Sequence, residues 1–352
     1  MNYKQLTFAR EYRGYTQTEL SNYIDGLSQS NLSKFEKGMG VLSNNLQDKI
    51  IEFLGFPREF FNRRISNTIE NGNYRKKSTS KGLVDEFESK CKLIGYTVDQ
   101  FSDDITWPEF DLTALNVEDG YSPQIIAGYT RKLLKLSNDS PVRNIYSLLE
   151  SHGIICYELD AHDKFDGVSF VTDLGTPIVI INRNIPNDRK RFTIAHELGH
   201  LLMHNESNFP ISGYRDREKE ANDFASEFLM PESGIKNSLY GLKMGDLSSL
   251  KQYWLTSMSS IIRRARDLNC INESRYKFFM IEFSRMGLSR RENVTVPIDE
   301  PELLIKGKEL FETELGYTEK EFIESLALPD DVIKVIIPRD EVGAKILKLK
   351  RN

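Results

Sequence analysis

The chain has 352 residues, of which 39% are hydrophobic and 28% charged, and this composition excludes a largely disordered protein and allows two or three folded domains. The 47 Lys and Arg residues against 52 Asp and Glu residues give a formal net charge of −5, which excludes a polycation that coats nucleic acid but allows a local basic face. No apolar run approaches the roughly 18 to 20 residues of a membrane span, and the first residues do not form a signal peptide, so we expect a cytoplasmic protein without a membrane partner.

Residues 1–65 have the pattern of a bundle of short helices. Over residues 1–64 there are nine basic and seven acidic side chains, a local charge of +2. Thr16 and Glu19 form a capping box that opens one helix, and Ser28 can cap another over residues 29–37. The outer face of that second helix carries short polar side chains, which can hydrogen-bond to base edges without filling a major groove. These side chains include Gln29, Ser30, Asn31 and Lys34.

The run RGYTQTELSNYIDGLSQSNLSKFEKG resembles the helix-turn-helix of the phage-repressor-like (XRE-type) family, over about the first 60 residues. The resemblance implies a double-stranded DNA operator as partner, bound by a homodimer. It also implies that Gln17 lies near a phosphate, while Gln29, Ser30, Asn31 and Lys34 face bases and backbone. The alternative is a plain helical bundle with a polar surface.

Residues 66–82 contain few apolar side chains and a basic cluster, and they mark a domain boundary. The cluster could add phosphate contacts or could simply solvate a linker. Helical periodicity returns over residues 83–101, 122–136 and 142–152.

Strand patterns follow at residues 154–159, 167–172 and 177–182, with a turn at 173–175 between the last two. We expect a small, partly antiparallel sheet. If the strand at 178–181 lies at an edge, a peptide substrate could add to it by β-augmentation.

Residues 187–204 form one predicted helix that contains the sequence His-Glu-x-x-His. The spacing puts His196 and His200 on one face, about 6 Å apart, so that two imidazole nitrogens can converge on one cation. Glu197 can reach a water at that cation and is suited to act as a general base. His204 lies about 12 Å along the axis from His196, too far to share the same ion, and is expected to pack or to support a ligand.

The third ligand must come from another segment. The three cysteines are far apart in the sequence, so a carboxylate is the expected donor, and zinc is the expected metal. The predicted helix at residues 217–230 places Glu218 on the side of its apolar stripe, and Asn222, one turn further on, could steady a ligand histidine. Glu220 lies on a different face and remains the alternative ligand.

The stretch RFTIAHELGHLLMH, followed by EKEANDFASEFLMP, closely resembles the ImmA/IrrE family of zinc metallopeptidases. A repressor-like domain followed by this peptidase is an architecture of that family, and the resemblance covers roughly residues 1–65 and 120–290. It implies a gluzincin-like site with His196, His200 and a helix glutamate on zinc and Glu197 as the catalytic residue. It also implies cleavage of repressor proteins, which switches on stress-response or mobile-element genes.

Residues 247–268 have the pattern of helix, turn and helix, with Trp254 and Leu255 buried and Arg263, Arg264 and Arg266 exposed. The tail contains two stretches with strand character, at 332–338 and 345–350, and it gives no functional signal.

Together these patterns predict an α+β fold, mainly α with a small β-sheet. The expected domains are a helix-turn-helix domain (1–65), a linker and helical segment (66–120), a gluzincin-like zinc peptidase (121–240), a helical, HTH-like segment (241–290) and a helical C-terminal region (291–352). The expected function is a DNA-binding regulator that cleaves a repressor, either a partner or its own chain. For self-cleavage, residues 66–82 are the most accessible segment, and a cut there would separate the DNA-reading module. The alternative is a repressor whose zinc pocket is a sensor or structural site with little turnover.

Overall fold

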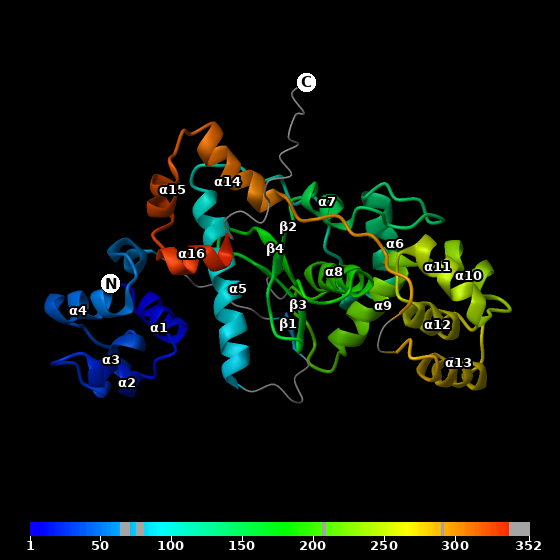
Figure 1. Ribbon diagram of the computed structural model, residues 1–352, viewed down its shortest axis with the longest axis horizontal. Helices are drawn as coiled ribbons and strands as arrows, with labels where there is room; N and C mark the ends of the chain where they lie inside the picture. Colours follow the sequence, from blue (N-terminus) through cyan, green and yellow to red (C-terminus); the bar gives the residue numbers. More distant parts are fainter. Residues whose placement is uncertain (64–70, 75–80, 206–208, 290–291, 338–352) are drawn as a thin grey trace, which may run out of the picture.

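The computed structural model describes residues 1–63, 71–74, 81–205, 209–289 and 292–337 (Figure 1). These residues form many short helices and one small sheet, so the predicted α+β class is confirmed. Among them, no helix has the length and apolar character needed to cross a bilayer.

The N-terminal residues fold as a helical bundle. The predicted capping box is present: Glu19 N–H donates to Thr16 Oγ1 (3.1 Å), and Thr16 N–H donates to Glu19 Oε2 (2.8 Å). Leu6, Leu20 and Leu32 are buried in its core. The elements are α1 (Tyr3–Tyr12), α2 (Gln17–Tyr23), α3 (Gln29–Glu36), α4 (Asn44–Leu54) and the 3-10 turn η1 (Arg58–Asn62).

The sheet has four strands in the order β1-β3-β4-β2, with β4 parallel to β2 and antiparallel to β3, and β1 antiparallel to β3. Strand β4 is therefore hydrogen-bonded on both sides and is not an edge strand, so the condition for adding a peptide to residues 178–181 is not met. The strands are β1 (Asn71–Tyr74), β2 (Ile155–Leu159), β3 (Phe165–Val171) and β4 (Pro177–Asn182).

Two helices cover the two faces of the sheet: α5 (Lys81–Phe101) on one side and α8 (Asn187–Met203) on the other (Figure 1). Successive residues of a strand point to opposite faces. Ile178 and Ile180 accordingly belong to the apolar core that contains the α5 residues, whereas Val179 and Ile181 share a core with α8. Because β4 is buried on both faces, its residues 177–181 are all apolar.

Helix α9 packs tightly against α8, since a Cβ built on Gly199 would lie only 3.0 Å from the Phe224 ring. This close approach brings the first turn of α9 to the histidine face of α8. The remaining elements before the C-terminal region are η2 (Val117–Asp119), α6 (Pro123–Leu133), α7 (Ile145–Glu150), α9 (Arg217–Leu229), α10 (Glu232–Leu239), η3 (Met244–Asp246), α11 (Leu247–Trp254), α12 (Met258–Asp267) and α13 (Glu273–Arg285).

The basic face predicted for residues 247–268 is smaller than expected. Trp254 and Leu255 are buried as predicted, but Arg264 is also buried, where its Nε donates to the Met230 carbonyl (3.0 Å) and its guanidinium pairs with Glu227. Arg264 therefore holds α12 to the end of α9.

The C-terminal region is helical and consists of α14 (Leu303–Thr313), α15 (Glu319–Leu326) and α16 (Asp330–Ile336). The strand predicted at 332–338 is wrong over Val332 to Ile336: Pro329 precedes the helix and two aspartates fill its first turn, both of which favour a helix start. The stretch 345–350 lies outside the described residues.

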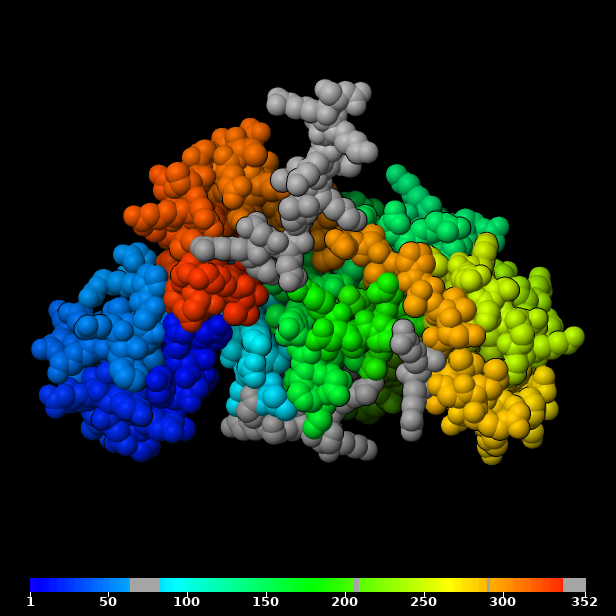
Figure 2. All heavy atoms as spheres, in the orientation of Figure 1, coloured from blue at the N-terminus to red at the C-terminus, as the bar shows by residue number. Residues whose placement is uncertain are grey.

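The C-terminal helices connect the N-terminal bundle to the rest of the molecule. Figure 2 shows the red end of the chain against the blue bundle. Arg63 Nη2 donates to the Ser325 carbonyl (2.9 Å), and Arg13 forms an ion pair with Asp331.

Candidate functional site

The two histidines of the His-Glu-x-x-His motif face one another on α8. Their Nε2 atoms are 3.0 Å apart, and both side chains are almost completely buried. The helical spacing of four residues thus directs two nitrogen lone pairs toward one point.

Glu218, in the first turn of α9, completes a group of three donors. Its Oε2 lies 3.6 Å from His196 Nε2, and its Oε1 lies 3.5 Å from His200 Nε2. Ligands about 2.0 to 2.2 Å from a tetrahedral zinc are separated from one another by about 3.3 to 3.6 Å, so both Glu218 distances fit zinc. The 3.0 Å between the two histidine nitrogens is slightly shorter than this range. The Glu218 side chain is 56% exposed, which leaves the group open to solvent on that side.

Asn222 orients the first histidine. Its Oδ1 lies 3.2 Å from Nδ1 of His196, at the position where Nδ1–H would donate. In that tautomer the Nε2 lone pair is available to a cation. The support that the sequence predicted for Asn222 is therefore present.

A second chain of contacts lies behind His200. His204 Nδ1 is 3.0 Å from His200 Nδ1, and His204 Nε2 is 2.9 Å from Glu220 Oε2, which in turn is held by Arg215 (2.6 Å to Oε1). Burial lowers the pKa of His204 to about 4, so its ring is neutral at pH 7 and can accept from His200 while donating to Glu220. Glu220 is thus directed to His204, and Glu218 is the carboxylate beside the histidine pair.

Glu197 is fully buried. Its Oε2 accepts a hydrogen bond from Ser169 Oγ on β3 (2.7 Å), while its Oε1 has no hydrogen-bond partner among the described residues. Burial raises the pKa of Glu197 to about 7, so this carboxyl can exchange a proton near neutral pH. Hydrogen bonds with His196 and His200 hold the pKa of Glu218 far below its ordinary range, so Glu218 is an anionic donor.

The polar residues predicted to read DNA lie on the N-terminal bundle. Gln29, Ser30, Asn31 and Lys34 are exposed on α3. Gln17 is half-buried: its Nε2 donates to Glu36 Oε2 (2.7 Å), and its Oε1 accepts from Gln29 Nε2 (3.0 Å). The two glutamines are therefore held in a fixed relation before any ligand binds.

Sequence reasoning did not find Ser169, because a serine in a buried strand gives no signal of its own until the strand is placed against α8. Tyr214 and Arg215 lie just before α9. The Tyr214 hydroxyl donates to Glu118 Oε2 (3.3 Å), and Arg215 pairs with Glu220.

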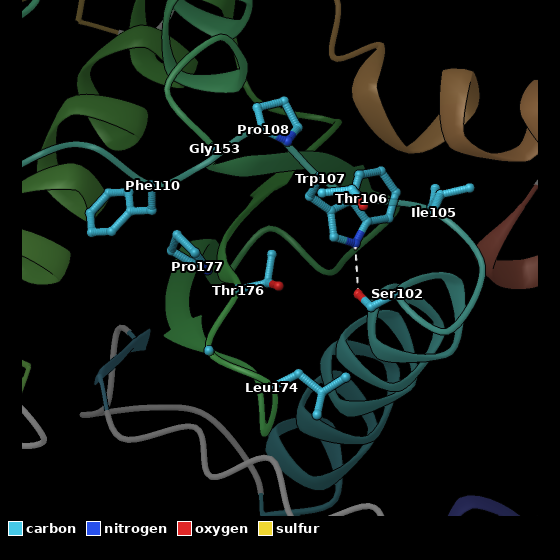
Figure 3. A pocket seen from close by; sticks show the side chains of 11 residues that line it. Ser102, Ile105, Thr106, Trp107, Pro108, Phe110, Gly153, Leu174, Thr176 and Pro177 are labelled. Atoms are coloured by element: carbon cyan, nitrogen blue, oxygen red, sulfur yellow. Dashed lines mark hydrogen bonds between the residues drawn. The ribbon is translucent and has the colours of Figure 1, made fainter.

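A cavity of about 290 Å³ lies elsewhere, between the end of α5 and the start of β4 (Figure 3). Trp107 Nε1 donates to Ser102 Oγ at its wall (2.9 Å). None of its lining side chains is titratable, so it offers no acid, base or metal donor.

Comparison with known proteins gives two findings. The family described as peptidase M78, the IrrE N-terminal-like domain, matches residues 149–266. These residues include α8 and α9 with all three donors. The chain is also 30% identical over 127 residues to the "Uncharacterized immunity region protein 2" of Bacillus phage phi105, an alignment that covers 34% of this chain and 78% of the relative.

Proposed function

The chain belongs to the IrrE N-terminal-like (peptidase M78) family, and on that premise we propose that it is a DNA-binding transcriptional regulator with zinc-dependent endopeptidase activity. Its substrate is a repressor, either a partner or its own chain, and cleavage switches gene expression in response to stress or a mobile-element signal. The relative from a phage immunity region supports a role in such control. The proposed place of action is the cytoplasm.

The zinc ion would be held by His196, His200 and Glu218, because their donor atoms all lie within 4.8 Å of one another. The group offers two imidazole nitrogens and one carboxylate oxygen. When bound, zinc supplies Lewis-acid polarisation of a carbonyl and of water. His204 and Glu220 keep the second histidine in the tautomer that leaves its Nε2 unprotonated.

Glu197 carries the proposal, because a purely structural or sensory metal site needs ligands but no base. Its carboxylate takes a proton from the attacking water and passes it to the leaving amine. Ser169 fixes one oxygen, so the other is the one that faces the reaction. The pKa of about 7 lets the same group act as base and then as acid.

The test combines metal analysis with a cleavage assay on the full chain, against candidate repressors and against the chain itself. His196→Ala is expected to lose zinc, whereas Glu197→Gln is expected to keep zinc and lose cleavage. Turnover by Glu197→Gln at the wild-type rate would rule out the enzymatic function. Bound zinc without cleavage of any target by the wild type would favour the sensor alternative.

We further propose that α3 reads a double-stranded DNA operator as part of a homodimer. Gln29 and Asn31 are exposed near the amino end of the helix, where side chains of such motifs reach base edges. Replacing both by Ala should abolish sequence preference while leaving salt-dependent binding. An unchanged footprint in the double variant would place the recognition surface elsewhere.

A further inference from the structure

The sheet edge closest to the proposed catalytic base is occupied by the chain's own residues 71–74. Strand β3 carries Ser169, whose hydroxyl donates to Glu197. One edge of β3 is hydrogen-bonded to β4 and the other edge to β1. In the pairing with β1, Asn71 lies directly opposite Ser169 and Gly72 lies opposite Val168. Neighbouring strands are about 4.8 Å apart, so the β1 backbone runs one strand away from the residue that positions the base.

The direction of β1 also matters. Gly167 of β3 contacts Thr193 of α8, and Ser169 contacts Glu197, so β3 and α8 run together toward the histidine pair. Because β1 is antiparallel, its Tyr74 end lies at Phe165 and its Asn71 end lies at Ser169. A peptide paired with β3 in this way has its amino-terminal part nearest to the site.

Residues 71–74 are poor strand formers. Their sequence is Asn-Gly-Asn-Tyr, and Asn and Gly are depleted in strands. The pairing also has a register shift between Asn73 and Tyr74. The strand therefore forms because β3 offers unpaired backbone groups, and a segment with stronger strand propensity can replace it.

We propose that β3 is the strand to which a peptide substrate adds, antiparallel, and that residues 71–74 occupy this position in the resting protein. The inference rests on the proposed peptidase function and specifies its regulation and its substrate class: an extended segment recognised through its main chain. Since the occupant is tethered, it competes at an effective concentration of the order of millimolar. The site is thus closed to other peptides until β1 leaves.

The first experiment measures binding rather than cleavage, in a full-length Glu197→Gln background. The probe is a fluorescein-labelled synthetic peptide of residues 66–80, followed by anisotropy. A second change, Gly72→Pro with Asn73→Pro, is designed to release β1 from the edge of β3. Adjacent residues of a strand point their N–H groups to opposite sides, so one of the two prolines removes a hydrogen-bond donor toward β3. We expect this variant to bind the probe at least about 10-fold more tightly than its parent, because the tethered competitor is gone.

The matched control places the same two prolines at Ser78 and Thr79, outside β1, and should leave the affinity of the parent unchanged. A probe peptide with prolines at the positions of Gly72 and Asn73 should not bind to any variant. Equal affinity of parent and Gly72→Pro/Asn73→Pro protein for the probe would overturn the proposal.

A second variant guards against misfolding of the proline protein. Gly72→Cys and Val168→Cys are directly opposite each other, and Val168 belongs to the core shared with α5, so Ser169 is not disturbed. Oxidation should link β1 to β3 and abolish probe binding, and reduction should restore the affinity of the parent. Binding that persists in the cross-linked protein overturns the proposal. Probe bound but never cleaved by a chain with Glu197 intact refutes the peptidase function alone.

Discussion

Three glutamates surround the histidine pair, and their environments assign them different tasks. Glu197 is buried and has a pKa raised to about 7 by burial, which suits proton transfer. Glu218 is half-exposed and is kept anionic by His196 and His200, which suits a metal ligand. Glu220 lies between His204 and Arg215, which suits a residue that orients the histidine rather than the metal. Sequence periodicity favoured Glu218 over Glu220, but the role of Glu220 became visible only through its contacts.

Paired substitutions separate these roles. Glu220→Gln should weaken zinc binding by about 10- to 100-fold, because it disturbs the support of a ligand rather than the ligand itself. Glu218→Gln should weaken it much more, because a coordinating carboxylate is lost. Competition with a chromogenic chelator measures both. The reverse order of the two variants would make Glu220 the ligand.

Asp99, at the C-terminal half of α5, is a buried acid away from the metal group. Burial raises its pKa to about 6, although its carboxylate accepts hydrogen bonds from Thr172 and from the backbone of Asp173 and Leu174. One of its oxygens, Oδ1, has no hydrogen-bond partner among the described residues. The folded protein therefore holds a proton here that the unfolded chain, with an ordinary value of about 3.9, has already released.

The pH dependence of stability follows from that difference. A raised pKa in the folded state stabilises the fold below about pH 4, and this contribution is lost as the pH rises through about 6. Relative to Asp99→Asn, the wild type should therefore lose about 2 kcal/mol of unfolding free energy between pH 4 and pH 7. Urea denaturation of both proteins at several pH values measures this. A constant difference across the range would show that Asp99 ionises in the fold as it does in the unfolded chain.

At the scale of elements, the contact between α8 and α9 decides whether the third donor reaches the histidines. Gly199 lies between the two motif histidines on α8 and faces the Phe224 ring of α9. A Cβ at this position would be 3.0 Å from that ring. Overpacking of this kind typically costs 1 to 3 kcal/mol and moves the packed helices apart.

Gly199→Ala should therefore destabilise the protein by about 1 to 3 kcal/mol and also lower zinc affinity, because α9 carries Glu218. The matched control is Gly128→Ala on α6, where a Cβ meets no atom within 4 Å. That control should be stabilising by up to about 1 kcal/mol, since Ala is the better helix former. Thermal melting and chelator competition provide the two readouts, and equal effects of both substitutions would contradict a tight contact.

The elements best predicted from sequence are those whose pattern is local. Residues 187–204 and 217–230 were expected as helices, and the structure has α8 and α9 within one residue of these bounds. The sequence does not predict strand β1, because three of its four residues are Asn or Gly, which are depleted in strands, and the strand forms by pairing with the edge of β3. The β-branched residues of 332–338 predict a strand, whereas Pro329 and the aspartates after it start a helix. Non-local pairing and local capping, respectively, explain the two errors.

Across the whole molecule, the N-terminal bundle is joined to the rest by packing as well as by residues 64–80. Phe60 and Phe61 of the bundle belong to the same apolar core as Tyr96 of α5 and Leu326 and Val332 of the C-terminal helices. The Tyr96 hydroxyl donates to the Leu326 carbonyl (2.9 Å) within this core. Asp331 of the ion pair with Arg13 is exposed, so this pair adds little. The contact is thus mainly apolar. Such a contact would hold the N-terminal bundle in place after a cut in the linker, which conflicts with the expectation that the cut by itself separates the DNA-reading module.

This packing can be tested by cutting the linker at will. A recognition site for a sequence-specific protease, inserted between residues 75 and 80, allows complete cleavage without any activity of the chain itself. We expect the two fragments to elute together in size-exclusion chromatography at about 10 μM, because an apolar interface of this kind persists without the covalent link. A chain ending at residue 318, which lacks α15 and α16, should release its N-terminal fragment after the same cut, while a chain ending at residue 337 should not.

If the cut full-length protein instead falls apart, residues 64–80 are the main connection and self-cleavage alone can remove the regulator from its operator. If the fragments stay together, a cut in the linker changes the sheet edge before it changes DNA binding, because β1 lies within the same segment. Cleavage there would then free β3 for a second substrate while the DNA-reading helix is still in place. In that case the repressor that loses function is a partner held near the same DNA, and the fate of residues 71–74 determines when the peptidase can reach it.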